Sequence, residues 1–182
     1  MLIVLSIILL ITILTVAIYN RFIQLKAFLD EASSGIDVQL KRRHDLIPNI
    51  VEVVKGYSRY ERGTLENVIK LRSQVSSLSF GSERNKMENE ISAGLKSLFA
   101  IAENYPDLKA NQNFLSLQNS LSEIEDQIQL ARRYYNGTAR NNNILVQSFP
   151  SNMIANVFHF SMAKFFEIEY ATERQVPDVK LG

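Results

Sequence analysis

Histidine and clustered charged residues are the side chains of this sequence that could do chemistry. The two histidines, His44 and His159, lie 115 residues apart, and neither has a second histidine at the spacing of a metal site. The chain has no cysteine, which excludes disulfides, thiolate metal sites and a cysteine nucleophile. It also lacks the glycine-rich phosphate loop, the dinucleotide fingerprint and the nucleophile elbow. We therefore expect no catalytic residue, no metal site and no cofactor.

Four polar residues interrupt the apolar pattern of the helices described below. They are Glu61, Thr64, Thr138 and Asn142. One hypothesis is a buried polar layer that fixes helix register or binds a small ligand, although a buried carboxylate would then need a partner. The alternative is that these positions lie at the edge of the helix contacts, in water. We favour the second interpretation because charged residues are seldom fully buried.

The sequence begins with an uncharged apolar stretch, residues 2–19. A run of 18 or more apolar residues is typical of a membrane-spanning helix. A signal peptide would need a basic leader, a shorter core and a cleavage site of small residues, none of which this stretch offers. A core helix would carry charge on one face. Because Arg21 and Lys26 follow the stretch and no basic residue precedes it, we expect a single-pass anchor with its N-terminus outside and the following domain in the cytoplasm.

The remaining sequence predicts long helices, because apolar residues recur at steps of three and four. A tight turn is predicted at His44 and Asp45, with Asp45 as the N-cap and Pro48 in the first turn of the next helix. A continuous, kinked helix is the alternative. That alternative also removes a mismatch of length, because a separate helix over 46–79 would overshoot the first by about 14 Å. Two further helices are expected around 87–102 and 114–145.

The fold class that follows is all-α, with an N-terminal transmembrane helix and an up-and-down four-helix bundle of long helices. We divide the chain into an anchor (1–20), a helical bundle (21–148) and an aromatic-rich extension and tail (149–182).

In such a bundle the first turn and the third connection lie at the same membrane-distal pole. The polar residues predicted to converge there are Lys41, Arg42, Arg43, His44, Asp45, Asp107 and Lys109. They could form a mixed-charge docking surface for a partner. The same residues could instead cap helices and compensate helix dipoles, and we favour this structural interpretation.

Aromatic side chains crowd the segment after the bundle. The phenylalanines among them are Phe149, Phe158, Phe160, Phe165 and Phe166. The fourth helix should return toward the bilayer, so this segment should be close to the membrane. It could cap the end of the core or lie in the lipid interface as an amphipathic element. Core capping is the favoured interpretation, because Lys164 is the only cation of the segment.

The charge balance argues against nucleic acid as a partner. The 20 Lys and Arg residues face 19 Asp and Glu residues, a net charge of +1. Such a chain has no overall field to attract a polyanion, and the Lys-Arg-Arg run at 41–43 has no aromatic platform for bases.

Several longer motifs resemble the signature of the LemA family. These are DVQLKRRHDLIPN at 37–49, NYPDLKAN at 104–111, ARRYYN at 131–136 and FPSN at 149–152. The resemblance covers nearly the whole chain. It implies a bacterial membrane protein with an N-terminal anchor and a helical bundle, and it implies no established catalytic activity. Ser33, Tyr60 and Asn142 depart from the family pattern.

We accordingly expect a non-enzymatic, membrane-tethered scaffold or adaptor, whose partners are the bilayer, through residues 2–19, and other membrane proteins. A lipid-binding or membrane-shaping protein is the main alternative, and a membrane-associated enzyme is a third. The identity of the partner and self-association both stay open.

Overall fold

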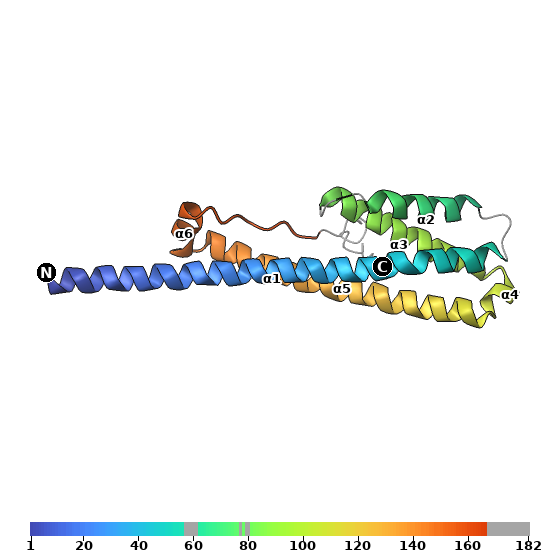
Figure 1. Cartoon of the computed structure of the whole chain (residues 1–182), viewed down its shortest axis with the longest axis horizontal. Coiled ribbons are helices and arrows are strands. Elements are labelled where there is room, and N and C mark those ends of the chain that lie inside the picture. The colour runs from blue at the N-terminus through green and yellow to red at the C-terminus, as the bar shows by residue number, and fades with distance from the viewer. Residues whose placement is uncertain (57–61, 77, 79–80, 167–182) are drawn as a thin grey trace, which may run out of the picture.

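The computed structural model describes residues 1–56, 62–76, 78 and 81–166. Within these ranges the chain is helical and has no strand, which confirms the predicted all-α class. The helices are α1 (Leu2–Lys55), α2 (Arg62–Val75), α3 (Ser82–Ala102), α4 (Pro106–Lys109), α5 (Gln112–Gln147) and α6 (Ser151–Val157). The molecule is long and narrow, with α1 running along most of its length (Figure 1).

The apolar start of α1 projects from the rest of the molecule (Figure 1). No residue before Phe22 is buried, although this part is the most hydrophobic stretch of the chain. Among the described residues, α1 is the one helix that is long and apolar enough to cross a membrane. The rest of the described chain therefore does not cover this stretch over most of its length.

The predicted turn at His44 and Asp45 is wrong, because α1 continues through both residues to Lys55 with Pro48 in its interior. Proline lacks the N–H that would bond the carbonyl four residues earlier, which here belongs to His44. The guanidinium of Arg72, on α2, supplies the missing donor: its Nε lies 2.8 Å from the His44 oxygen. A contact from a distant part of the chain thus makes the proline tolerable inside the helix.

Two apolar clusters divide the molecule into what we call the head and the stalk. The head cluster takes buried residues from α1, α2, α3, α4 and α5, for example Ile50, Val68 and Leu95. The stalk cluster takes them mainly from α1 and α5, for example Ile36 and Ile128. In the head, α1, α2, α3 and α5 run in alternating directions, whereas in the stalk α1 and α5 continue as a pair (Figure 1).

After α6 the chain reverses at His159, whose φ of 58° is the left-handed conformation that histidine tolerates better than most residues. Residues 160–166, which we call the strap, then run back along the stalk (Figure 1). Asparagines of α5 hold the strap backbone as a neighbouring strand would. Asn143 Nδ2 donates to the Ala163 oxygen (2.9 Å) and its Oδ1 accepts from the Ala163 nitrogen (2.8 Å). Asn136 pairs with Phe166 in the same way.

A double-mutant cycle tests the role of Arg72. We expect Arg72→Met to lower the free energy of unfolding by about 1–3 kcal/mol, since it leaves the His44 carbonyl without its donor. In a Pro48→Ala background the backbone N–H of residue 48 can bond that carbonyl, so the same substitution should cost clearly less. Urea unfolding of the four proteins in detergent measures the coupling, and strictly additive costs would contradict this account.

Candidate functional site

A buried ion cluster lies where the stalk joins the head. Its centre is the guanidinium of Arg43 on α1, whose exposed fraction is 0%. Arg43 Nη1 donates to Glu125 Oε1 on α5 (2.7 Å), and Nη2 donates to the backbone oxygen of Glu88 on α3 (3.1 Å). It also bonds the Glu88 carboxylate and the Ser92 hydroxyl. One cation therefore connects three helices.

Glu88 is the buried anion of this cluster, with an exposed fraction of 1%. His44 Nε2 lies 3.1 Å from its Oε2, and Arg84 Nε lies 4.0 Å from its Oε1. Burial by itself raises the pKa of Glu88, but the hydrogen bond from His44 and the positive charge of Arg43 together outweigh burial and lower its pKa. Glu88 is therefore ionised in the folded protein at neutral pH.

The helical phase explains why Arg43 points inward. It follows Ile36 and Leu40 and precedes Ile47 on the same apolar stripe, at steps of three and four residues. Glu88 likewise continues the α3 stripe of Ile91. Each charged residue occupies a core position, and the two meet across the helices between the two apolar clusters.

The structure does not bring the predicted membrane-distal pole together. Arg43 is buried, so it cannot belong to a docking surface. Lys41 and Asp45 form an exposed ion pair (3.2 Å) in the middle of α1, and Arg42 donates to Gln39. Asp107 and Lys109 lie in α4, at the far end of the head (Figure 1). The two groups are separated because α1 continues past residue 45, and Asp45 does not cap a helix.

Part of the predicted docking set instead lines a groove of about 530 Å³ between α1, α2 and the start of α3. The charged and imidazole side chains that line it are Asp37, Lys41, His44, Asp45, Arg72 and Arg84. Arg84 Nη2 pairs with Asp37 Oδ1 (2.8 Å), so charges of both signs are already matched on the groove wall. In the described part of the chain, no group of three or more metal-ligating side chains comes together.

The four polar interruptions are not brought together either. Glu61 lies outside the described residues, and Thr64 is half-buried on α2 in the head. Thr138 and Asn142 are buried on α5, in the stalk, so the favoured solvated interpretation is wrong for both. The reason is that the chain passes over this face of α5, where Asn142 Nδ2 donates to the Ser161 oxygen (3.1 Å).

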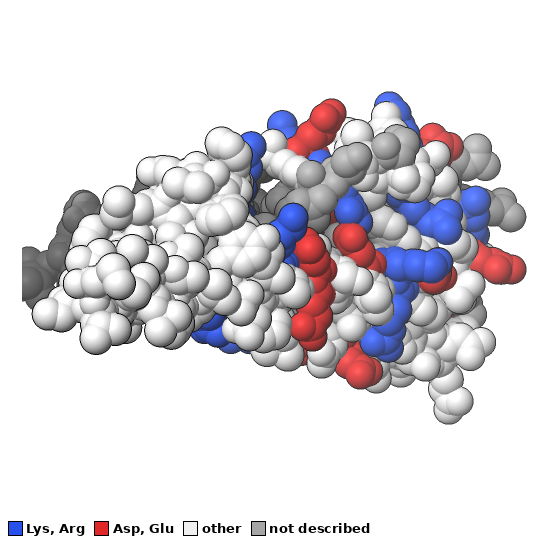
Figure 2. Space-filling view, turned by 60° about the vertical axis from the view of Figure 1, so that its left-hand side comes forward, with Lys and Arg blue, Asp and Glu red and all other residues white. Residues whose placement is uncertain are grey.

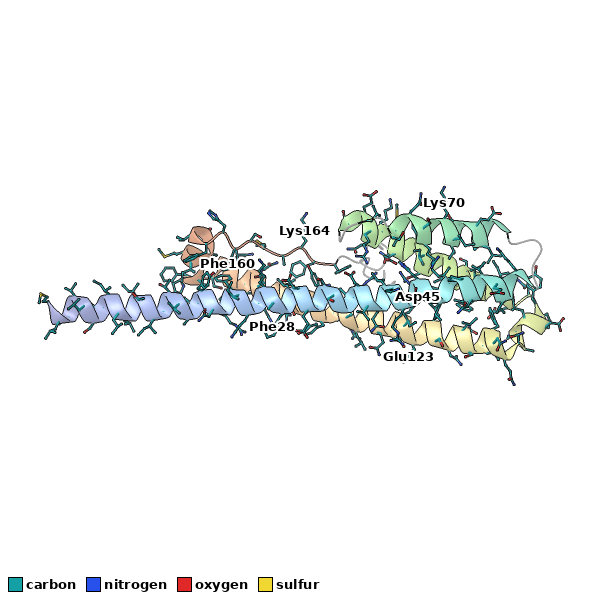
Figure 3. All side chains as sticks on the ribbon, viewed as in Figure 1. Phe28, Asp45, Lys70, Glu123, Phe160 and Lys164 are labelled. Atoms are coloured by element: carbon teal, nitrogen blue, oxygen red, sulfur yellow. The ribbon has the colours of Figure 1, made fainter. Side chains whose placement is uncertain are left out.

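The five phenylalanines of the aromatic segment fall into two groups. Phe166 is buried in the stalk cluster, and Phe160 stacks on Phe22 of α1 with ring centroids 4.5 Å apart. Figure 3 shows Phe160 beside α1. Phe149, Phe158 and Phe165 are exposed. Two of the five, Phe160 and Phe166, therefore pack against the helices, and the other three do not.

Five functional residues were not predicted from the sequence. They are the partners of Arg43, which are Glu88, Ser92 and Glu125, and the residues that hold the strap, which are Asn136 and Asn143. A signal was present for Glu88 and Arg43, since each lies in phase with an apolar stripe. The sequence gives no comparable signal for the two asparagines. Their partner is the backbone of the strap, which has no regular secondary structure and so no periodic pattern.

Replacing Arg43 by methionine tests the cluster. The substitution leaves the Glu88 carboxylate buried without its main cation, so we expect the free energy of unfolding to fall by about 3–5 kcal/mol. Arg42→Met is the matched control, because Arg42 is the neighbouring and exposed arginine, and it should change stability by less than about 0.5 kcal/mol. Similar losses for the two variants in urea unfolding would show that Arg43 is not the connecting charge.

The pH dependence of stability tests Glu88 itself. Because its pKa is lower in the folded than in the unfolded state, where the ordinary value is 4.5, its stabilising contribution is complete above that value. The contribution is lost as the pH falls through the folded-state pKa. Between about pH 7 and about pH 3, Glu88→Gln should therefore lose less unfolding free energy than the unchanged protein. Parallel curves for the two proteins would contradict this assignment.

The sequence is similar to those of several known proteins. The model of the LemA family matches residues 32–181. The chain is 28% identical to Protein LemA of Metamycoplasma hominis, over 78% of this chain and 66% of that protein. It is 23% identical to Magnetosome protein MamQ 2 of Paramagnetospirillum magneticum, over 82% of this chain and 64% of the relative. The chain thus spans slightly less than two thirds of these relatives. Because the family match covers most of its length, the chain belongs to the LemA family.

Proposed function

We propose that this LemA-family protein is a single-pass, membrane-tethered scaffold that acts by binding other membrane proteins and not by catalysis. In this proposal residues 2–19 span the bilayer, the stalk leads away from it, and the head packs as an up-and-down four-helix bundle. The observation that carries the proposal is the apolar stretch at the start of α1, of which folding buries no residue while the rest of α1 is built into the head and stalk.

The charges nearest the apolar stretch support a cytoplasmic location of the head. Residues 1–29 and 134–166 form the anchor and the adjoining part of the stalk, and they hold no Asp or Glu. Their cations are Arg21, Lys26, Arg140 and Lys164, all of which are exposed. An excess of lysine and arginine beside a membrane span is typical of its cytoplasmic side.

The geometry of the buried cluster supports binding over catalysis. His44 and Glu88 are the natural candidates for acid–base chemistry, but Glu88 is buried and its carboxylate is bonded by both Arg43 and His44. The nearby groove offers side chains of both signs, which suits a charged segment of a partner protein. Lys41 lies 22 residues beyond Tyr19 on one continuous helix, so the groove stands about 33 Å from the end of the apolar stretch. The tether raises the effective concentration of such a partner in the same membrane.

A charge swap on the groove tests this function. Lys41→Glu with Asp45→Lys keeps an ion pair at i and i+4 but reverses the two exposed charges that the groove presents. A photo-reactive residue at Ser73, which also lines the groove, should crosslink a discrete set of membrane proteins in native membranes. We expect the swap to abolish these products.

The matched control is Glu66→Lys with Lys70→Glu, an exposed pair on α2 outside the groove (Lys70 is labelled in Figure 3). This control should leave the crosslinks intact. The scaffold proposal fails at this groove if both swaps leave the same products, and products that contain only a second copy of the chain would indicate self-association instead.

A further inference from the structure

The surface of α6 presents large apolar side chains to solvent. On α6, Met153 is 61% exposed and Val157, one turn later, is 71% exposed. Phe149, just before the helix, is 80% exposed. The chain carries no charged residue between Arg140 and Lys164. Figure 2 shows this end of the molecule as an uncharged surface, with the charged side chains beginning farther along. Contiguous exposed apolar side chains of this kind, on and beside a helix of seven residues, are typical of a surface that contacts a partner or a membrane.

The position of α6 along α1 decides what covers this surface. Tyr19 of α1 packs edge-on against Phe158, with ring centroids 4.9 Å apart, and against Phe160 at 5.7 Å. Thr15, Ile18 and Tyr19 are partly buried, whereas the preceding residues of the chain are exposed. Since α6 contacts α1, it is α6 and the start of the strap that lie beside the last turn of the apolar stretch.

The length of the apolar stretch then fixes the depth of α6. Its 18 residues, 2–19, extend about 27 Å as a helix, slightly less than the roughly 30 Å of a hydrocarbon core. When residues 2–19 span the core, their last turn lies near the boundary between acyl chains and headgroups. A helix packed against that turn lies at the same depth.

From these observations we propose that α6, with Phe149 just before it, is a second membrane-contacting element, which lies in the interface of the same leaflet and inserts Phe149, Met153 and Val157 among the acyl chains. The inference rests on the proposed anchor. Residues 1–29 and 134–166 carry the exposed cations Arg21, Lys26, Arg140 and Lys164 and no Asp or Glu, which suits anionic headgroups. Aromatic side chains at this depth are typical of membrane interfaces.

The consequence concerns orientation. A single spanning helix leaves the head free to tilt and to turn about its own long axis. A second contact beside the anchor, fixed to it by the rings of Tyr19, Phe22 and Phe160, restricts both motions. The groove on the head would then stand at a defined height and at a defined angle to the membrane plane.

Depth-dependent quenching tests the inference, and the absence of native cysteine makes a single label unambiguous. The full chain is labelled through Met153→Cys with an environment-sensitive fluorophore and reconstituted into vesicles of phosphatidylethanolamine and phosphatidylglycerol. The quenchers are two lipids, one with a nitroxide near the top of its acyl chain, for the labels at 153, 157 and 115, and one with a nitroxide near the end of the chain, for the label at 10. Val157→Cys provides a second label on the same face. Leu10→Cys in the anchor and Leu115→Cys, exposed at the start of α5 in the head, are the controls.

We expect labels at 153 and 157 to be quenched at least about twofold more than the label at 115, because interfacial helices bury their apolar face about 5–10 Å deep. Strong quenching at 10 with quenching at 153 and 157 no greater than at 115 would overturn the inference and leave the anchor intact. Absence of quenching at 10 would overturn the anchor and, with it, this inference.

Discussion

The buried guanidinium of Arg43 is the interaction on which the rest of the structure depends. It lies between the two apolar clusters and bonds carboxylates from α3 and α5, so it fixes the position of both helices along α1. A displacement of one helix turn would leave a buried charge without its partner, at a cost comparable to the whole stability of many domains. Below this cluster α1 and α5 form a two-helix stalk, and above it α2 and α3 complete the head.

The sequence predicted the helical class, the exposed apolar stretch and most of the apolar stripes, because these follow from local periodicity. It did not predict the continuity of α1. Pro48 beside Asp45 resembles the start of a helix, and the contact that overrides this signal comes from Arg72 on α2. A donor placed by tertiary packing cannot be inferred from neighbouring residues, so the turn and the convergent pole built on it were both wrong.

The sequence brought some residues of the groove to attention. Lys41, His44 and Asp45 line the groove, whereas Arg43 belongs to the core. The run of three cations at 41–43 gives no indication of which one is buried, and only the phase of the stripe through Leu40 and Ile47 distinguishes it. Burial of Asn142 and Asn143 was not predictable, because the strap that covers them has no periodic pattern.

The account as a whole requires that the apolar start of α1 lies in lipid, since the height of the groove and the depth of α6 both follow from it. The most direct measurement is extraction of native membranes with alkaline carbonate, with the intact chain followed by an antibody against the head. The account predicts that the chain stays with the membrane pellet, together with an integral membrane marker. Release of the intact chain into the supernatant, as completely as a soluble marker, would contradict it.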